Sequence, residues 1–309
     1  MIPPRARLLL ALIALLSVAC PLDSHAQQQT HVLNITVTNS KDRIVPGLKP
    51  EHFTIKADGV AAKIVSSEVD KSPISVGILF DVSGSMGTLG NQRTLQIHER
   101  LETGLRRFLE LSNPDNDYFL TPFAAEVKSN ISWTVGNTSL RQNLGVPESG
   151  RTALYDAIYS GLERVQKGRN SRHVLLIISD GLDNNSKKTF KEAVEAIKRS
   201  DVTVFALGLV SNPDQGSALG MEAQGVLDEL TKVSGGRAQI LPQSSKPEAF
   251  RVAFENLANE LQSQYRLSME MEKTSSPEKW RKLKLNARYI DDDGRRSEAR
   301  IRARQGFYY

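Results

Sequence analysis

The sequence predicts an α/β protein, in which a doubly wound, mostly parallel sheet is inserted in a small β-sandwich built from both chain ends. Two observations support this prediction. Between about Ile74 and Leu241, short apolar segments alternate with longer segments whose apolar residues recur every three to four positions, the pattern of buried parallel strands joined by helices. Outside that region, apolar and polar residues alternate one by one, which is typical of strands with one buried face.

The central region contains five apolar segments that we expect to be strands: 74–80, 117–123, 173–179, 202–210 and 238–241. Amphipathic segments predict helices at 93–112, 153–168, 186–200, 225–235 and 247–264. The connecting helices suit right-handed crossovers between parallel neighbours. Residues 126–135 instead suit an antiparallel edge strand that is reached by a hairpin.

We expect the segments before and after the central region to pack together, because two or three strands cannot bury an apolar face alone. We therefore expect residues 27–72 and 263–309 to pair into one β-sandwich, with the domain of residues 73–262 inserted between them. Within 281–290, one face collects Leu283, Leu285, Ala287 and Tyr289. The basic residues of "KWRKLKLNAR" lie on the other face. We interpret them as a solvated strand face, and the alternative is a patch for anionic glycan, lipid headgroup or nucleic acid.

Residues 1–26 have the features of a secretory signal. Arg5 and Arg7 precede the apolar run "LLLALIALLSV", and "SHA" suits cleavage after Ala26. The run is too short to span a membrane as a helix, so we expect no transmembrane segment in the mature chain. We expect an exported bacterial protein that is periplasmic, attached to the cell envelope or secreted. The alternative is a lipoprotein anchored through Cys20, in the loosely lipobox-like "SVAC".

Cysteine content and charge exclude several kinds of protein. The one cysteine precedes the cleavage site, so the mature protein must be stable without disulfides. A formal net charge of +5 over 309 residues gives no case for nucleic acid as a partner.

Polar side chains gather after the first predicted strand, in "DVSGSMG" at residues 81–87. A simple chain reversal needs the glycines but not so many side-chain oxygens. Two other segments should reach the same edge, because ligands of open parallel sheets bind beyond the carboxyl ends of the strands. The candidate ligands are two carboxylates and three hydroxyls: Asp81, Ser83, Ser85, Thr152 and Asp180.

This set of oxygen donors favours Mg²⁺ or Mn²⁺. Zinc or copper would usually recruit histidine or cysteine, and the five histidines show no ligand spacing. If one carboxylate binds directly and the other through water, the hydroxyls leave the dication poorly neutralised. It should then attract a carboxylate from another molecule.

At these residues the sequence resembles the von Willebrand factor type A (VWA) family. The "DVSGS" motif, Thr152 and "SDG" are similar to its metal-ion-dependent adhesion site, whose pattern is Asp-x-Ser-x-Ser, a threonine and an aspartate. The resemblance covers roughly Ser72 to Leu261 and implies a Rossmann-like sheet with strand order 3-2-1-4-5-6. It also implies a metal whose last position is filled by an acidic residue of a partner protein. The flanks look like those of a bacterial exported subfamily.

Simpler interpretations remain for several of these features. "DVSGSMG" could cap the next helix, and Asp180 could begin an Asp-Gly turn. We interpret Asp156 as a charge that complements a helix dipole, and Asp183 as a solvated loop residue or a residue behind the ligands. The loop 211–225 could contact a partner near the metal or be an insertion without function.

We expect a metal-dependent adhesion or protein-binding module and not an enzyme. Its partner would be a protein that presents an Asp or Glu to the ion. A second possibility is a scaffold in which the metal only stabilises loops. A third is a hydrolase that forms an aspartyl-phosphate, but Ser83 occupies the place where such enzymes need a second carboxylate.

Overall fold

The computed structural model describes residues 28–86, 92–127, 132–135, 150–210, 218–272 and 279–308. The predicted signal, its cleavage site and Cys20 lie outside these residues. Within them, no helix is long and apolar enough to cross a membrane.

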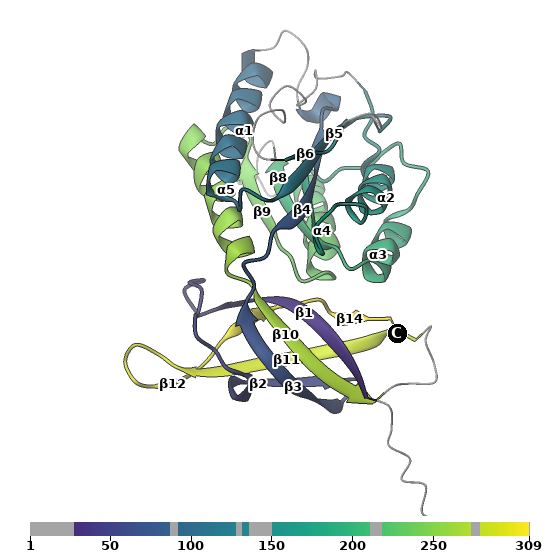
Figure 1. Ribbon diagram of the computed structural model, residues 1–309. Coiled ribbons are helices and arrows are strands. Elements are labelled where there is room, and N and C mark those ends of the chain that lie inside the picture. Colours follow the sequence, from purple (N-terminus) through teal and green to yellow (C-terminus); the bar gives the residue numbers. More distant parts are fainter. Residues whose placement is uncertain are drawn as a thin grey trace, which may run out of the picture.

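The α/β domain is built on a six-stranded sheet (Figure 1). Its strands are β4 (Ile74–Asp81), β5 (Asp117–Phe123), β6 (Thr134–Val135), β7 (Arg172–Ser179), β8 (Thr203–Val210) and β9 (Ala238–Pro242). Their order is β6-β5-β4-β7-β8-β9, which is the implied order 3-2-1-4-5-6, and only β6 runs antiparallel. The predicted edge strand is thus present but short. Residues 128–131 of that segment are outside the described residues.

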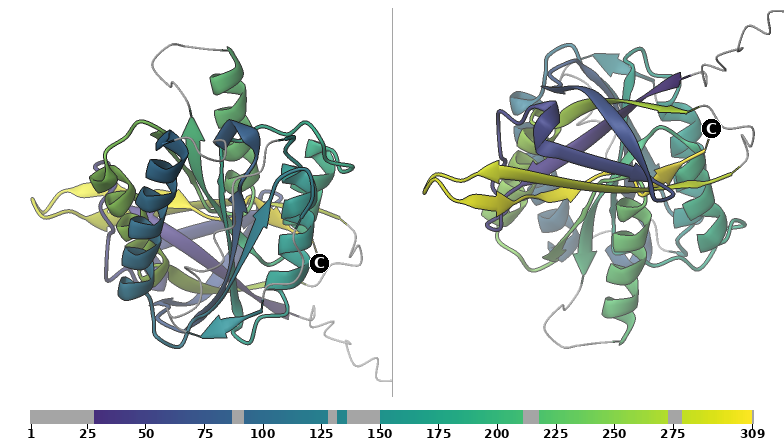
Figure 2. Two further views of the ribbon diagram at one scale, coloured as in Figure 1. Left: turned by 90° about the horizontal axis from the view of Figure 1, so that it is seen from above. Right: turned by 90° about the horizontal axis from the view of Figure 1, so that it is seen from below.

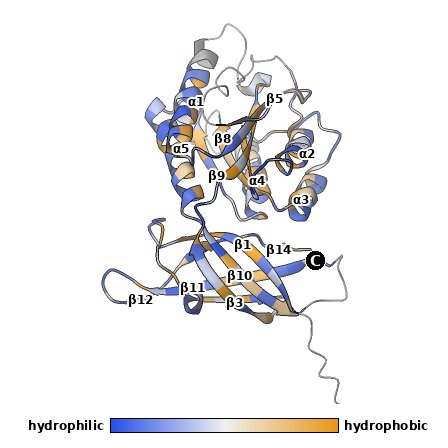
Figure 3. Ribbon diagram, viewed as in Figure 1, coloured by the Kyte–Doolittle hydropathy of each residue, from blue (hydrophilic) through white to orange (hydrophobic). Residues whose placement is uncertain are grey.

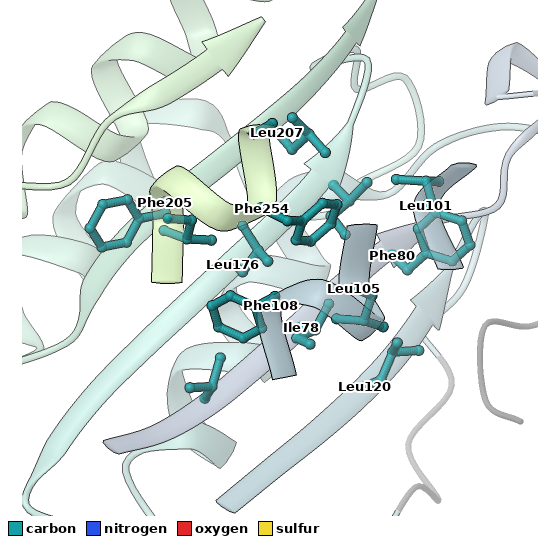
Figure 4. Packing of buried hydrophobic residues seen from close by; sticks show 14 of the residues in the cluster. Ile78, Phe80, Leu101, Leu105, Phe108, Leu120, Leu176, Phe205, Leu207 and Phe254 are labelled. Carbon is teal, nitrogen blue, oxygen red and sulfur yellow. The ribbon is translucent and has the colours of Figure 1, made fainter. Parts of the chain in front are cut away.

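Helices cover both faces of this sheet (Figure 2, left). One face carries α1 (Gln92–Leu111) and α5 (Pro247–Gln262), and the other carries α2 (Leu154–Val165), α3 (Phe190–Arg199) and α4 (Ala218–Lys232). Figure 4 shows the first layer, where Leu105 and Phe108 of α1 and Phe254 of α5 pack on Ile78 and Leu176 of the sheet. Because both faces are covered, all eight residues of β4 are buried, as its continuous apolar sequence predicts.

One predicted element boundary is wrong. We expected a loop over 211–225 and a helix from 225, but α4 begins at Ala218. Residues 211–217 are outside the described residues. The glycines at 220 and 225 weaken the helix signal in the sequence, because glycine has a low helix propensity. Packing compensates, since Ala223 and Leu227 are buried against the sheet.

Strands from the two chain ends form one barrel-like sheet in place of the expected two facing sheets (Figure 1). They are β1 (Gln28–Thr38), β2 (Phe53–Ala57), β3 (Val60–Val69), β10 (Tyr265–Glu272), β11 (Arg281–Ile290), β12 (Arg296–Glu298), β13 (Arg300–Arg302) and β14 (Gly306–Phe307). The strand order is β12-β11-β2-β3-β10-β1-β13, with β14 on β11. β12 pairs with β11, and β13 pairs with β1. Only Ala299 separates β12 from β13, so this one short segment connects the two ends of the sheet.

The alternation predicted for 281–290 is confirmed, and it is visible as alternating colour along the strands in Figure 3. Ala287 is buried, and Leu283, Leu285 and Tyr289 pack against the core of the barrel-like domain. The opposite face is exposed: Lys282, Lys284, Asn286 and Arg288. The basic stretch is therefore a solvated strand face.

Two buried charged residues join the barrel-like domain to the α/β domain. The Arg172 guanidinium, 6% exposed, donates to the backbone oxygens of Asp70, Ser72 and Leu261 and to the Gln264 side chain. Glu260 of α5, 3% exposed, accepts a hydrogen bond from Thr36 of β1 and forms an ion pair of 2.9 Å with Arg302 of β13. Such contacts hold the domains in one arrangement, because each buried polar group needs its partner.

Candidate metal centre

The first ligand segment begins where β4 ends. Asp81 is its last residue and is fully buried, so its carboxylate stays at the sheet edge. The backbone N–H of Ser83 donates to Asp81 Oδ1 at 2.9 Å, and Val82 N–H donates to the Phe123 carbonyl of β5. A short 3-10 turn, Gly84–Met86, follows and buries Met86. Val82 and Met86 are both buried, so the loop between them stays close to the end of β4.

The second segment follows β7, the parallel neighbour of β4. Asp180 is 7% exposed, and its Oδ1 accepts a hydrogen bond from Leu182 N–H. The residue before it, Ser179, donates from its hydroxyl to Asp81 Oδ2 at 2.6 Å. The two aspartates therefore lie at the ends of adjacent strands, with one hydroxyl between the strands holding Asp81 in place.

The third segment is the loop before α2, which carries Thr152. Gly84 N–H donates to the Gly150 carbonyl at 3.4 Å, and a Cβ on Gly84 would lie 3.4 Å from Gly150 N. Thr152 is 2% exposed, and its backbone is held from the other side by three hydrogen bonds with Asn184 and Asn185. The fold thus brings all five predicted residues to one edge of the sheet, the edge farthest from the barrel-like domain (Figure 1).

The hydroxyls of Ser83 and Ser85 lie 3.2 Å apart. Ser83 is fully buried and Ser85 is exposed, so the pair runs from the strand end to the surface. The Ser85 side chain also acts to lower the pKa of Asp180, which favours the charged form of that carboxylate. The loop therefore presents oxygen atoms both to the interior and to solvent.

Burial makes the charges of both carboxylates costly. It raises the pKa of Asp81 to about 6, against the opposing hydrogen bonds from Ser179 and Ser83, and the negative charge of Asp180 adds to the rise. Burial also raises the pKa of Asp180. Within the described part of the chain, no Lys, Arg or His forms an ion pair with either group. Two buried acids with no protein cation favour a bound cation.

The donor chemistry fits a hard divalent cation. Nowhere in the described residues do three or more His, Cys, Asp or Glu cluster in a metal-binding arrangement, so a site here must use hydroxyl oxygens as well as carboxylates. Carboxylates, hydroxyls and water are the ligands of Mg²⁺ and Mn²⁺ rather than of zinc or copper. Asp81, Ser83, Ser85, Thr152 and Asp180 would hold the ion, and it would supply a positive charge that can accept an acidic ligand.

Asp183 and Asp156 have structural partners. Asp183 is half-buried, not solvated as we expected; its Oδ2 accepts from Tyr155 N–H in the first turn of α2 and from the Ser186 hydroxyl. Asp156 accepts from the backbone N–H groups of Lys187 and Lys188. Both carboxylates satisfy backbone donors that would otherwise be unpaired, which is the usual role of an acid near a helix start.

Sequence reasoning missed two residues that support the site. Ser179 is the serine of "SDG", but no spacing rule marks it as a partner of Asp81. Gln243 follows β9 and is 3% exposed; its side chain donates to the carbonyls of Ser85 and Leu209 at 3.2 Å each. A glutamine in "LPQSS" has no sequence signal for this contact, because 158 residues separate it from Ser85.

The chain belongs to the von Willebrand factor type A domain family, whose family model matches residues 75–263, more than half of its length. A sequence search of curated proteins found no match.

Three solved bacterial structures illustrate the fold similarity. A von Willebrand factor type A protein from Catenulispora acidiphila is 10% identical, with a TM-score of 0.47 over 91% of this chain and 74% of that one. The vWF domain of the type V pili tip protein Mfa5 from Porphyromonas gingivalis is 12% identical, with a TM-score of 0.48 over 62% and 95%. The pilus adhesin SpaC from Lactobacillus rhamnosus GG is 11% identical, with a TM-score of 0.47 over 82% and 48%.

Proposed function

We propose that this protein is an exported bacterial binding module and not an enzyme. Asp81, Ser83, Ser85 and Thr152 hold Mg²⁺ or Mn²⁺ directly or through water, and Asp180 is an outer carboxylate that orients a metal-bound water. The ion then captures an Asp or Glu side chain of a partner protein. In this proposal the VWA domain is an insertion in the barrel-like domain.

The observation that carries the proposal is the pair of buried carboxylates without a protein counter-ion. Leaving two such charges uncompensated is costly, so the site favours a dication. Since only one of the acids is a direct ligand in the proposal, the bound ion keeps a net positive charge. A carboxylate from a partner neutralises that charge, whereas the hydroxyl ligands cannot.

The first experiment measures the metal alone. Titration calorimetry of the mature chain with MgCl₂ and MnCl₂ should show one saturable site that Asp81→Asn abolishes. Asp292→Asn removes the same charge from an exposed turn of the barrel-like domain, so it is the matched control and should bind normally. Equal metal binding by Asp81→Asn would overturn the metal site.

The second experiment tests partner capture. Native envelope protein is passed over the immobilised mature chain with MgCl₂, with MnCl₂ or with EDTA, and Asp81→Asn is run in parallel. We expect a partner that is retained only with the metal and only by the unaltered chain. Binding that survives both EDTA and Asp81→Asn would contradict capture through the metal. A metal-dependent rise in Tm without any metal-dependent partner would instead favour a metal that only stabilises the loops.

A further inference from the structure

A cavity of about 460 Å³ lies between the two domains. One wall is formed by residues 29–34 of β1 and by Arg266 of β10, and the other by the starts of β7 and β8 at Arg172 and Thr203. Parallel strands place the metal loop at their carboxyl ends, so this cavity is at the opposite edge of the sheet from Asp81. It is therefore separate from the candidate metal centre.

Two of the three arginines in this cavity already have partners. Arg172 donates to three carbonyls and the Gln264 side chain, and its Nε lies 3.4 Å from Asp70. Arg304 pairs with Asp201 at 2.8 Å and also donates to two backbone carbonyls. Their charges are compensated, so neither offers a free guanidinium to a ligand.

Arg266 differs from both. No hydrogen bond or ion pair joins its guanidinium to any other residue that the structure describes. Its positive charge acts against that of Arg172, whose pKa is lowered first by burial and also by Arg266. Glu68 of β3 lies opposite Arg266 in the strand register but forms no ion pair with it. The like charge of Arg172 and the lack of an ion pair within the described residues make an anion favourable at this point of the cavity.

The strand register places an amide beside this guanidinium. Asn34 of β1 is directly opposite Arg266 of β10, so both side chains lie on the same face of the sheet, which faces the cavity. The Asn34 Oδ1 atom is buried and accepts no hydrogen bond from the described residues. The site thus offers a cationic donor to an oxyanion, and rotation of the Asn34 amide would turn its unpaired oxygen toward a ligand hydroxyl or N–H group.

The remaining wall is partly apolar. Val32 of β1, which is 46% exposed, lines the cavity, and the buried Val202 and Phe307 lie behind this wall. Such a surface suits the body of a small ligand whose polar head is held on one side.

We propose that this cavity binds a small oxyanion that also carries a hydrogen-bond donor. The Arg266 guanidinium holds the oxyanion, and Asn34 accepts the ligand's hydroxyl hydrogen. Both a hydroxycarboxylic acid and hydrogen phosphate have this chemistry. The apolar wall predicts tighter binding of the organic acid.

The test is titration calorimetry of the mature chain in EDTA, with mandelate and inorganic phosphate as probes and NaCl at equal ionic strength as the blank. EDTA removes any metal from the candidate metal centre. The result therefore does not depend on the metal-dependent binding proposed for that centre. Saturable binding of either probe supports the oxyanion site, and their relative affinities identify the kind of ligand. Absence of saturable binding of both probes overturns the proposal.

Two variants locate the site. Arg266→Gln should weaken binding at least about tenfold, since it removes the charged donor. Arg43→Gln removes the same charge from an exposed loop and should bind like the unaltered chain.

Asn34→Asp places a carboxylate opposite Arg266, where it should pair with the guanidinium. We expect a higher Tm without ligand and loss of anion binding. Unchanged binding in both cavity variants would contradict the assignment.

Discussion

The Ser179 hydroxyl donates a 2.6 Å hydrogen bond to Asp81 Oδ2, across the ends of two adjacent parallel strands. The same hydroxyl accepts from Gly181 N–H, so its own orientation is held by the loop that carries Asp180. Through this one side chain, the segments that provide the two carboxylates of the candidate metal centre are connected. Ser179 is thus a positioning residue for Asp81.

Ser179→Ala should weaken Mg²⁺ binding about tenfold, because residues that orient a ligand typically contribute that much to metal affinity. Titration calorimetry measures the effect. Ser200→Ala is the matched control: Ser200 is also a buried serine with a hydrogen-bonded hydroxyl, but it lies at the end of α3. It should lose stability by about 1 kcal/mol and keep its metal affinity. Equal affinity in both variants would contradict the positioning role.

Asp81→Asn should stabilise the metal-free protein. Folding raises the pKa of Asp81 to about 6, so the charged form is less favourable in the folded chain than in the unfolded chain at pH 7. An amide of the same shape removes that cost, and we expect a gain on the order of 1 kcal/mol. The measurement is urea unfolding at pH 7 in EDTA. A loss of stability would contradict the cost that we assign to the buried charge.

Gln243→Leu should loosen the metal loop. The variant keeps the approximate volume but loses the hydrogen bonds to the Ser85 and Leu209 carbonyls. We expect metal affinity to fall several-fold and hydrogen exchange at the amides of residues 85 and 86 to become faster. Gln166→Leu is the control, because its side chain donates to a carbonyl at the end of α2, away from the loop. If both variants exchange like the unaltered chain, Gln243 does not hold this loop.

Glu260→Gln should weaken the junction between the domains. The buried Glu260 carboxylate pairs with Arg237 at 2.8 Å and Arg302 at 2.9 Å, and loss of its charge leaves both guanidiniums uncompensated. We expect a loss of about 3 kcal/mol in urea unfolding. Glu255→Gln breaks an ion pair with Arg251 nearer the surface of α5 and should cost less than about 1 kcal/mol. Similar losses in the two variants would show that the junction does not depend on Glu260.

Local sequence patterns predicted the elements with strong periodicity. The run at 74–80 was assigned as a strand because buried parallel strands are apolar on both faces, and β4 is buried throughout. The same approach placed the start of α4 at residue 225, whereas the helix begins at Ala218. Packing against the sheet outweighs the low helix propensity of Gly220 and Gly225. It also gave no means to foresee that β12 and β13 join both ends of one sheet, since strand pairing depends on contacts that are distant along the chain.

The sequence by itself determined the succession of strands and helices along the α/β domain, because the hydrophobic period is a local property. It also determined the set of oxygen donors, because side-chain chemistry is local as well. Only the tertiary structure decided how those donors are supported. Ser179 and Gln243 act through hydrogen bonds to residues that are distant in sequence, and no spacing rule encodes such contacts. The cavity that Arg266 lines likewise combines residues of both domains, which no local pattern predicts.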